Sequence, residues 1–275
     1  MSADHASRRK RSTFGRLGLV TALLALTLSG GSMANATNAS TDEARPTIVL
    51  VHGAFADASG WNEVTKRLQA EGYPVVAPAN PERGLLIDSA YLSSILSTID
   101  GPVVLVGHSY GGAVITNAAI GHPNVKALVY IAAFAPDLGE TVGGLVLKNP
   151  GSGLTPENLV LRPYPVGVDG YISPRVFHEV FAADLPAETA AIMAAGQRPA
   201  ETTILVTPSG LPAWRTIPSW YMVAADDKTI PPATERFMAQ RAGATTVEIR
   251  SSHVAMISHP DAVKKLIVDA AKTAH

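Results

Sequence analysis

A serine lies at the centre of the most informative motif in this chain. Residues Gly107–Gly111 read Gly-His-Ser-Tyr-Gly, directly after the apolar run Val103–Val106 and just before a helical pattern over 112–121. A strand, a tight turn and a helix in that order would expose a serine on a strained turn, where glycine tolerates crowding and unusual dihedral angles. The pattern predicts that Ser109 is a nucleophile. The alternative is a turn that uses glycine and serine for its shape alone.

A serine hydroxyl needs a base to take its proton, and histidine is the usual one. Three of the eight histidines follow the apolar run Thr245–Ile249: His253 and His259 shortly after it, and His275 as the last residue of the sequence. We assign the base to His253, which a short loop separates from that run. His259 precedes a proline and is expected to begin the last helix or to lie on the surface.

The histidine needs a carboxylate to orient it and to stabilise its charged form. Asp226 and Asp227 both follow the apolar run Trp220–Ala224. We assign Asp227, because Ile230 and Pro231 complete a spacing Asp-x-x-hydrophobic-Pro; Asp226 is the alternative. The resulting chain order of Ser, Asp and His differs from that of the chymotrypsin and subtilisin types.

Attack on a carbonyl creates an oxyanion, which two backbone N–H groups must meet. We assign one donor to Tyr110, directly after the nucleophile, and the other to Ala54, in the loop that follows the apolar run Thr47–Val51. Two aromatic residues near these donors, Phe55 and Trp61, predict an apolar substrate pocket. Burial in the core is the alternative for both.

The elements that must position these residues alternate along the chain. Apolar runs predict strands at 47–51, 74–77, 103–106, 125–132, 220–224 and 245–249, and helical spacing predicts helices at 61–70, 89–99, 112–121, 233–242 and 261–273. Runs without polar alternation are typical of strands buried on both faces, and the strand–helix rhythm indicates a parallel sheet. The fold class is therefore α/β, with helices on both faces of the sheet.

One long segment, residues 136–209, breaks this rhythm. It contains several prolines and two helical patches around 174–182 and 186–196. Because a loop of that length without structure of its own is unusual, we interpret the segment as a cap inserted into the core. A set of ordinary long loops is the alternative.

The first residues have the order of a secretory signal peptide. A basic stretch, Arg8–Arg16, precedes the apolar run Leu17–Ser29 and the small residues Ala34–Ala36. That run is short for a bilayer span, which needs about 20 residues. We predict a signal peptide at 1–36, a flexible leader at 37–45 and one domain at 46–275. The mature protein would be secreted or periplasmic and not bound to a membrane; an uncleaved membrane anchor is the alternative.

Composition narrows the classes of partner. The chain has 275 residues, 47% of them hydrophobic, a formal net charge of −1 and no cysteine. Disulfides and thiolate chemistry are excluded, and nothing in the charge favours a nucleic acid. The chain lacks the His-Glu-x-x-His pattern and a dinucleotide fingerprint, so we predict no metal and no cofactor. The expected partner is a small-molecule ester.

Taken together, the motifs resemble those of bacterial α/β-fold hydrolases related to the plant methylesterase, salicylate-esterase and hydroxynitrile-lyase group. They are the segments 52–55, 107–112, 227–232, 252–253 and 258–260, together with Trp61. The resemblance spans about residues 46–273 and implies the α/β-hydrolase fold, a small helical cap and a cofactor-free Ser-His-Asp esterase. Lyases of this group carry Thr at the position of Gly53 and Lys at the position of Val254, so both residues favour hydrolysis.

The expected function is therefore cleavage of carboxylic esters through an acyl-enzyme, as in carboxylesterases. The same residues would serve an amidase, a lactonase or a perhydrolase. A small-molecule-binding relative that turns nothing over is the alternative from another class.

Overall fold

The computed structural model describes residues 45–274. The predicted signal peptide at 1–36 lies outside that range, as does most of the predicted leader. Six strands form one sheet in the order β2-β1-β3-β4-β8-β9, and every neighbouring pair is parallel. The strands are β1 (Thr47–Val51), β2 (Val75–Val76), β3 (Val103–Ser109), β4 (Val125–Ala133), β8 (Ser219–Ala224) and β9 (Thr245–Ile249).

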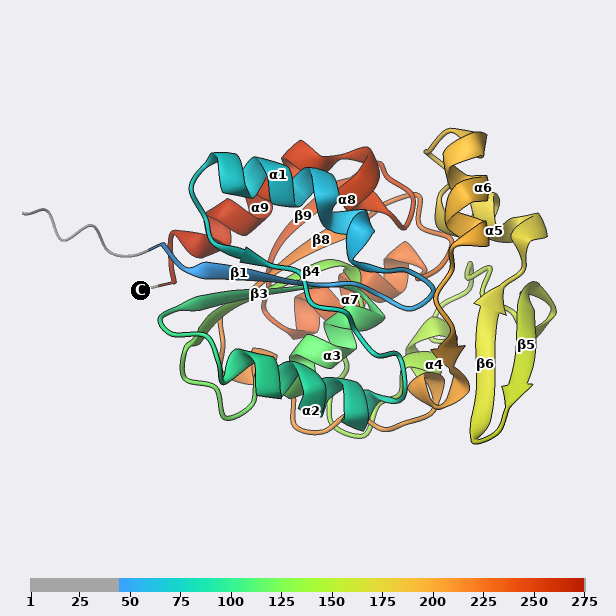
Figure 1. The fold of residues 1–275 in the computed structure, drawn as a ribbon, viewed down its shortest axis with the longest axis horizontal. Helices are drawn as coiled ribbons and strands as arrows, with labels where there is room; N and C mark the ends of the chain where they lie inside the picture. The colour runs from blue at the N-terminus through green and yellow to red at the C-terminus, as the bar shows by residue number, and fades with distance from the viewer. Residues whose placement is uncertain (1–44, 275) are drawn as a thin grey trace, which may run out of the picture. The chain divides into compact units, whose positions relative to one another are not determined.

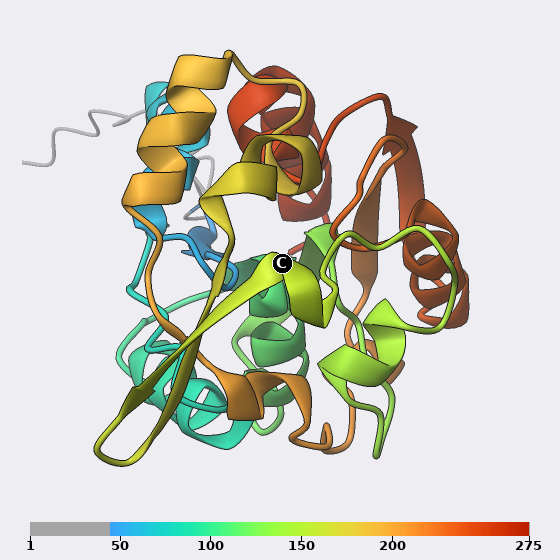
Figure 2. The ribbon, with the colours of Figure 1, turned by 90° about the vertical axis from the view of Figure 1, so that its right-hand side faces the viewer.

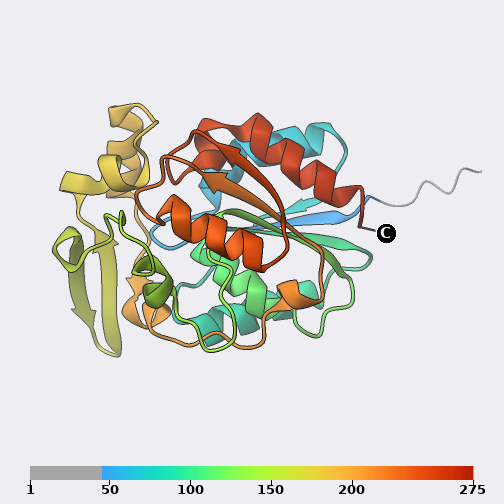
Figure 3. The same cartoon turned by 180° about the vertical axis from the view of Figure 1, so that it is seen from behind.

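Helices cover both faces of this sheet, which is why its central strands are mostly apolar. One face carries α1 (Asn62–Ala70), α8 (Ala255–Ser258) and α9 (Pro260–Ala271); the other carries α2 (Leu85–Leu96), α3 (Tyr110–Ala118) and α7 (Pro232–Arg241) (Figures 1 and 3). Every residue of β3 is buried. The predicted α/β fold with a parallel sheet is confirmed.

The strand order creates a crevice at β1. From β1 the chain passes to β2 on one side, and β3 then pairs with the other side of β1. The loops that leave β1 and β3 therefore diverge, and ligands of open α/β sheets bind at such a point, beyond the carboxyl ends of the strands. Residues 52–55 follow β1, and Ser109 ends β3.

The cap, residues 136–209, lies beyond the same ends of the strands (Figure 1). It contains α4 (Val142–Val146), β5 (Leu159–Tyr164), β6 (Gly167–Ile172), α5 (Pro174–Phe181), α6 (Ala187–Ala195) and β7 (Ala200–Glu201). Helices α5 and α6 pack together and lie at the positions of the two predicted helical patches (Figure 2). Strands β5, β6 and β7 form an antiparallel sheet that the sequence analysis did not predict.

Residues 45–274 also contain four short 3-10 helices: η1 (Ala58–Trp61), η2 (Pro156–Asn158), η3 (Thr202–Leu205) and η4 (Ala213–Arg215).

An ion pair of 2.5 Å between Arg83 and Asp169 connects the loop before α2 to β6 of the cap. Within residues 45–274, no helix has the length and the apolar character needed to cross a membrane.

Candidate active site

Ser109 occupies a strained turn between β3 and α3. Its φ is 52° and its ψ is −125°, a conformation that non-glycine residues rarely adopt. The flanking glycines allow this turn because neighbouring backbone comes very close. A Cβ on Gly107 would lie 2.7 Å from backbone atoms of Gly111, and a Cβ on Gly111 would lie 2.5 Å from the carbonyl oxygen of Val51. The turn therefore holds Ser109 in one conformation at the crevice.

His253 and Asp227 form a buried hydrogen-bonded pair. The imidazole Nδ1 lies 2.6 Å from Oδ2 of Asp227, and neither side chain is exposed. The other carboxylate oxygen, Oδ1, accepts hydrogen bonds from the N–H groups of Thr229 at 2.6 Å and Ile230 at 2.9 Å. Because Nδ1 donates to a carboxylate, Nε2 is the nitrogen that can accept a proton. Within residues 45–274, Nε2 has no hydrogen-bond partner.

His108 connects this pair to the turn that carries Ser109. Its ring lies 4.7 Å from the ring of His253, centroid to centroid, and its Nε2–H donates a hydrogen bond of 2.9 Å to the carbonyl oxygen of His253. Burial, together with the neighbouring imidazole of His253, lowers the pKa of His108 well below its usual value. A neutral His108 thus fixes the backbone of His253 beside the nucleophile turn.

The alternative acid and base lie outside the buried pair. Asp226 is exposed and faces Arg250 at 3.5 Å. His259 stands at the N-terminal boundary of α9, where its Nδ1 lies 2.8 Å from the hydroxyl of Ser258. The structure thus pairs His253 with Asp227, sets this pair beside His108, the residue before Ser109, and leaves Asp226 and His259 outside the pair.

The loop after β1 packs directly against the nucleophile turn. A Cβ on Gly53 would lie 2.6 Å from the Cβ of Ser109, so a larger residue does not fit there without a shift. Phe55 has a φ of 65°, and its N–H donates to Oε2 of Glu82 at 3.2 Å. With that N–H committed to Glu82, Phe55 is not a candidate oxyanion donor, whereas the N–H of Ala54 has no such acceptor among the described residues. Tyr110 is the first residue of α3, so the helix itself does not use its N–H.

Glu82 is a buried carboxyl group behind this loop, and no motif identified it. Its side chain is fully buried, with Oε1 at 3.6 Å from Nδ1 of His52 and 3.7 Å from Nε of Arg198. Burial raises the pKa of Glu82 to about 9, although the N–H of Phe55 and the charge of Arg198 act in the opposite direction. Glu82 is therefore a neutral acid at pH 7, and it holds the backbone beside the proposed oxyanion donor.

The substitution Glu82→Gln is expected to remove a pH dependence of stability. Between the usual pKa of 4.5 and the folded value of about 9, the folded state binds a proton that the unfolded state has lost, so the wild type loses stability as the pH rises. Relative to Glu82→Gln, the loss amounts to at most about 1.4 kcal/mol per pH unit. Denaturant unfolding of both proteins over this range measures it. If the free energy of unfolding changed with pH in the same way in both proteins, the raised pKa of Glu82 would be contradicted. Glu157→Gln makes the same change at an exposed site and is the control.

A cap carboxylate, Asp184, is tied to the loop that carries His253. Its Oδ2 accepts hydrogen bonds from the N–H of Ser252 at 3.0 Å and from the hydroxyl of Ser251 at 3.2 Å, and its Oδ1 accepts one from the hydroxyl of Ser252. Burial alone would raise the pKa of Asp184, but the hydrogen bonds from Ser252 and its neighbours hold it below its usual range. The loop before the histidine is thus fastened to the segment between α5 and α6.

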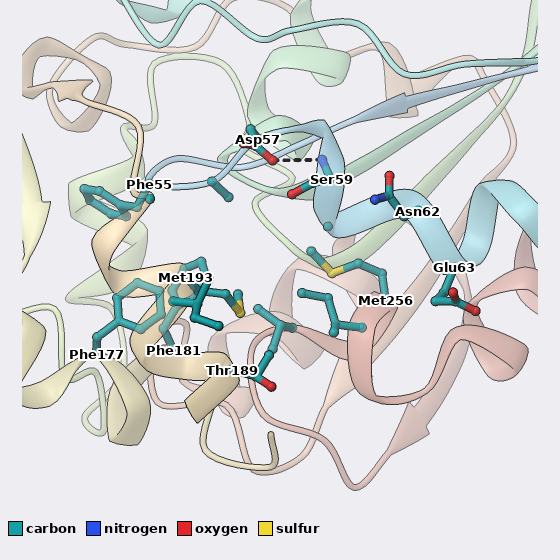
Figure 4. A pocket seen from close by; sticks show the side chains of 16 residues that line it. Phe55, Asp57, Ser59, Asn62, Glu63, Phe177, Phe181, Thr189, Met193 and Met256 are labelled. Atoms are coloured by element: carbon teal, nitrogen blue, oxygen red, sulfur yellow. Dashed lines mark hydrogen bonds between the residues drawn. The ribbon is translucent and has the colours of Figure 1, made fainter. Parts of the chain in front are cut away.

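A cavity of about 380 Å³ lies between the cap helices and the core (Figure 4). Phe177 and Phe181 of α5 and Met193 of α6 line it from the cap, and Met256 of α8 lines it from the core. A short polar edge comes from η1 and α1, where Asp57 accepts the N–H of Ser59 at 2.8 Å. The remaining lining residues are Phe55, Ala56, Gly60, Asn62, Glu63, Thr189, Ile192, Gly196, Val254 and Ile257.

The cavity lies next to His253, although Ser109, Asp227 and His253 do not line it themselves. The ring of Phe181 lies 4.9 Å from the ring of His253, centroid to centroid, and Val254 follows that histidine in the chain. Of the two residues predicted to line a pocket, Phe55 does so. Trp61 does not: it is fully buried with its ring edge-on to His108, so it belongs to the core beneath the site.

The described residues, 45–274, contain no cluster of three or more His, Cys, Asp or Glu side chains arranged to hold a metal ion. The site is built from a serine on a strained turn, a buried imidazole–carboxylate pair and a loop with backbone donors. This combination on a parallel sheet is characteristic of α/β hydrolases.

Comparison with known proteins gives the family. Residues 48–266 match the model of the alpha/beta hydrolase family, and the chain belongs to that family. A pyrethroid hydrolase from Sphingobium wenxiniae is 30% identical over 248 residues, which cover 81% of this chain and 86% of that protein. Methylesterase 8 from Arabidopsis thaliana is 28% identical over 211 residues, 69% of this chain and 75% of its own length.

Solved structures of related proteins support the same fold. A pyrethroid hydrolase from Sphingobium faniae superposes with a TM-score of 0.68 at 27% identity, covering 82% of this chain and 97% of its own. Polyneuridine aldehyde esterase superposes with a TM-score of 0.70 at 22% identity, covering 82% and 98%, and supports the fold. The resemblance stated from the motifs is confirmed, and the relatives indicate that this protein is a hydrolase with esterase-type chemistry.

Proposed function

We propose that this protein is a serine esterase that cleaves carboxylic esters through an acyl-enzyme, with Ser109, His253 and Asp227 as its catalytic residues. One observation carries the proposal: the buried hydrogen bond of 2.6 Å between His253 and Asp227 leaves Nε2 as the only proton-accepting nitrogen, next to a strained serine turn. A general base for a serine hydroxyl needs this tautomer.

In the proposed reaction, Nε2 of His253 takes the proton from Ser109 while Oγ forms a bond to the ester carbonyl carbon. The carbonyl oxygen becomes an oxyanion, which the N–H groups of Ala54 and Tyr110 stabilise. The C–O bond to the alcohol then breaks as His253 returns its proton to the leaving oxygen. Water attacks the acyl-enzyme with the same histidine as base, and this step releases the acid and restores the serine.

The cavity supports an apolar ester as substrate. Its cap side consists of aromatic and thioether side chains, Phe177, Phe181 and Met193, and it adjoins the proposed base. Burial of apolar surface in such a cavity contributes about 25 cal/mol per Å² to binding, before the cost of immobilising the ligand. Relatives that share a quarter to a third of their residues are named as a pyrethroid hydrolase and a methylesterase. We therefore propose hydrophobic carboxylic esters as the substrate class.

Labelling with a fluorophosphonate tests the proposal. The wild type is expected to form a covalent adduct on Ser109, because only an activated serine attacks phosphorus at neutral pH. Peptide mass spectrometry locates the adduct. A protein that only binds small molecules would stay unlabelled, and this result would reject the proposal. Esters and amides of graded acyl length then separate an esterase from an amidase or a lactonase.

Export is proposed as well. The basic, apolar and small-residue segments within residues 1–36 support a cleaved signal peptide. The amino terminus of the secreted protein, determined by mass spectrometry, is expected at Thr37; an intact terminus in a membrane fraction would indicate an anchor instead.

A further inference from the structure

A second carboxyl group lies behind the proposed catalytic acid. Glu235 stands in the first turns of α7, and its side chain is fully buried. One of its oxygens, Oε2, accepts the N–H of Ala224, the last residue of β8, at 3.1 Å. Asp227 is held to the same residue, because its own N–H donates to the carbonyl oxygen of Ala224 at 3.2 Å. Besides burial, the charge of Asp227 and hydrogen bonding with it are among the causes that raise the pKa of Glu235. Two acidic side chains thus meet in the interior of the protein.

The acceptor sites of Asp227 leave room for one more donor. A carboxylate has about four lone-pair sites. Three are filled, by the N–H groups of Thr229 and Ile230 and by the imidazole of His253. The contact with Glu235 is therefore available as the fourth hydrogen bond, provided that one of the two carboxyl groups carries a proton.

Glu235 is the group that carries the proton. Its Oε1 is buried and receives no hydrogen bond from any donor within residues 45–274. Burial, and then the negative charge of Asp227, raises the pKa of Glu235 well above its usual value. Asp227, by contrast, already accepts hydrogen bonds from three donors.

The other ionisable groups that face Glu235 are already engaged. The hydroxyl of Tyr221 donates to the carbonyl oxygen of Ala133, and Arg236 pairs with Glu248 on the surface. Neither supplies a proton or a counter-charge to Oε1. Within residues 45–274, this leaves the carboxylate of Asp227 as the candidate partner of Oε1.

We propose that Glu235 is a positioning residue that keeps its proton and donates it in a hydrogen bond to Asp227, while Ala224 holds its other oxygen. The inference rests on the proposed Ser-His-Asp function. The pair carries one negative charge, so Asp227 remains the carboxylate that His253 needs. The hydrogen bond fixes the orientation of that carboxylate from the side opposite the histidine.

Two substitutions separate a donor from a space-filling side chain. In Glu235→Gln, the amide oxygen can accept the N–H of Ala224 and the amide nitrogen can donate to Asp227, so kcat is expected to stay within about threefold of the wild type. In Glu235→Leu, the donor is lost. We expect kcat to fall about ten- to a hundredfold with little change in KM, as for the loss of one hydrogen bond to a charged group.

Infrared spectroscopy gives a readout that does not depend on turnover. The wild type at neutral pH is expected to show two carbonyl stretches of protonated carboxylic acids, one from the buried Glu82 and one from Glu235. Glu235→Gln is expected to lose the Glu235 band and to keep that of Glu82, which Glu82→Gln identifies. The control Glu157→Gln changes an exposed carboxylate and should leave both bands intact. A spectrum from which Glu235→Gln removes no such band would overturn the inference, as would a Gln variant as slow as the Leu variant.

The outcomes also distinguish this inference from the proposed function. A band that disappears only in Glu235→Gln supports the protonated pair even if a fluorophosphonate fails to label Ser109. Labelling of Ser109 without the band would support the esterase and reject the role of Glu235. Because Gln keeps the size and polarity of Glu, the spectrum remains interpretable even if the Leu variant does not fold.

Discussion

Replacement of Ser109 by alanine is expected to reduce kcat for a p-nitrophenyl ester by about a millionfold. The hydroxyl is the atom that would form the acyl-enzyme, and no other serine in the described chain stands on such a turn. Alanine keeps the Cβ, so its contact with Gly53 and the backbone conformation at φ 52° remain as they are. The variant should therefore fold with wild-type stability. Steady-state kinetics and thermal unfolding measure the two quantities separately.

Ser94→Ala is the matched control for this substitution. Ser94 is exposed on α2, and its hydroxyl bonds only to the carbonyl oxygen of Tyr91. The control should hydrolyse the ester at the wild-type rate. If Ser109→Ala turned over the ester nearly as fast as the control, the nucleophile would have to be another group.

The second large effect is expected for Asp227→Asn, which should lower kcat by about four orders of magnitude. The N–H groups of Thr229 and Ile230 both point at Oδ1, so the amide oxygen of the asparagine must take that position. The amide nitrogen then faces Nδ1 of His253, where two donors cannot meet. The imidazole is forced to carry its proton on Nε2, and it can no longer take one from the serine.

The neighbouring residue supplies the control for this prediction. Asp226→Asn makes the same chemical change one position away, at an exposed side chain that faces only Arg250. Its kcat should stay within about twofold of the wild type, as expected for a surface ion pair. A larger loss in Asp226→Asn than in Asp227→Asn would show that the acid was assigned to the wrong residue.

The central strands of the sheet could be predicted from the sequence because they are buried on both faces, whereas β9, at the edge, is largely exposed. The run at 245–249 agrees with β9 residue for residue, and the run at 125–132 misses only the last residue of β4. Helix starts were predicted less well. The helix after Ser109 begins at Tyr110 and not at Gly112. Its first glycines, Gly111 and Gly112, lie inside the helix and allow close packing against Val51 and Phe134. Helix α2 begins at Leu85, four residues before the expected start.

The antiparallel sheet of the cap could not be predicted, because its strands are not continuous buried apolar runs. Three consecutive residues of β5, from Leu161 to Pro163, are exposed, and β7 has only two residues. Neither strand shows the alternation of apolar and polar residues that marks a half-buried strand. The residues around the proposed triad were also missed. Glu82, Asp184 and Glu235 belong to no motif, and only the folded chain brings them to the loops and strand ends that they contact.

The link between Asp184 and the two serines before His253 has a consequence for enzyme engineering. Caps of related hydrolases are natural targets for exchange, because α5 and α6 shape the cavity. In this protein such a graft would also remove the acceptor for the N–H of Ser252, and so free the loop that presents the imidazole. A chimaera should therefore retain an acidic residue at position 184, or its new selectivity will come with slower turnover.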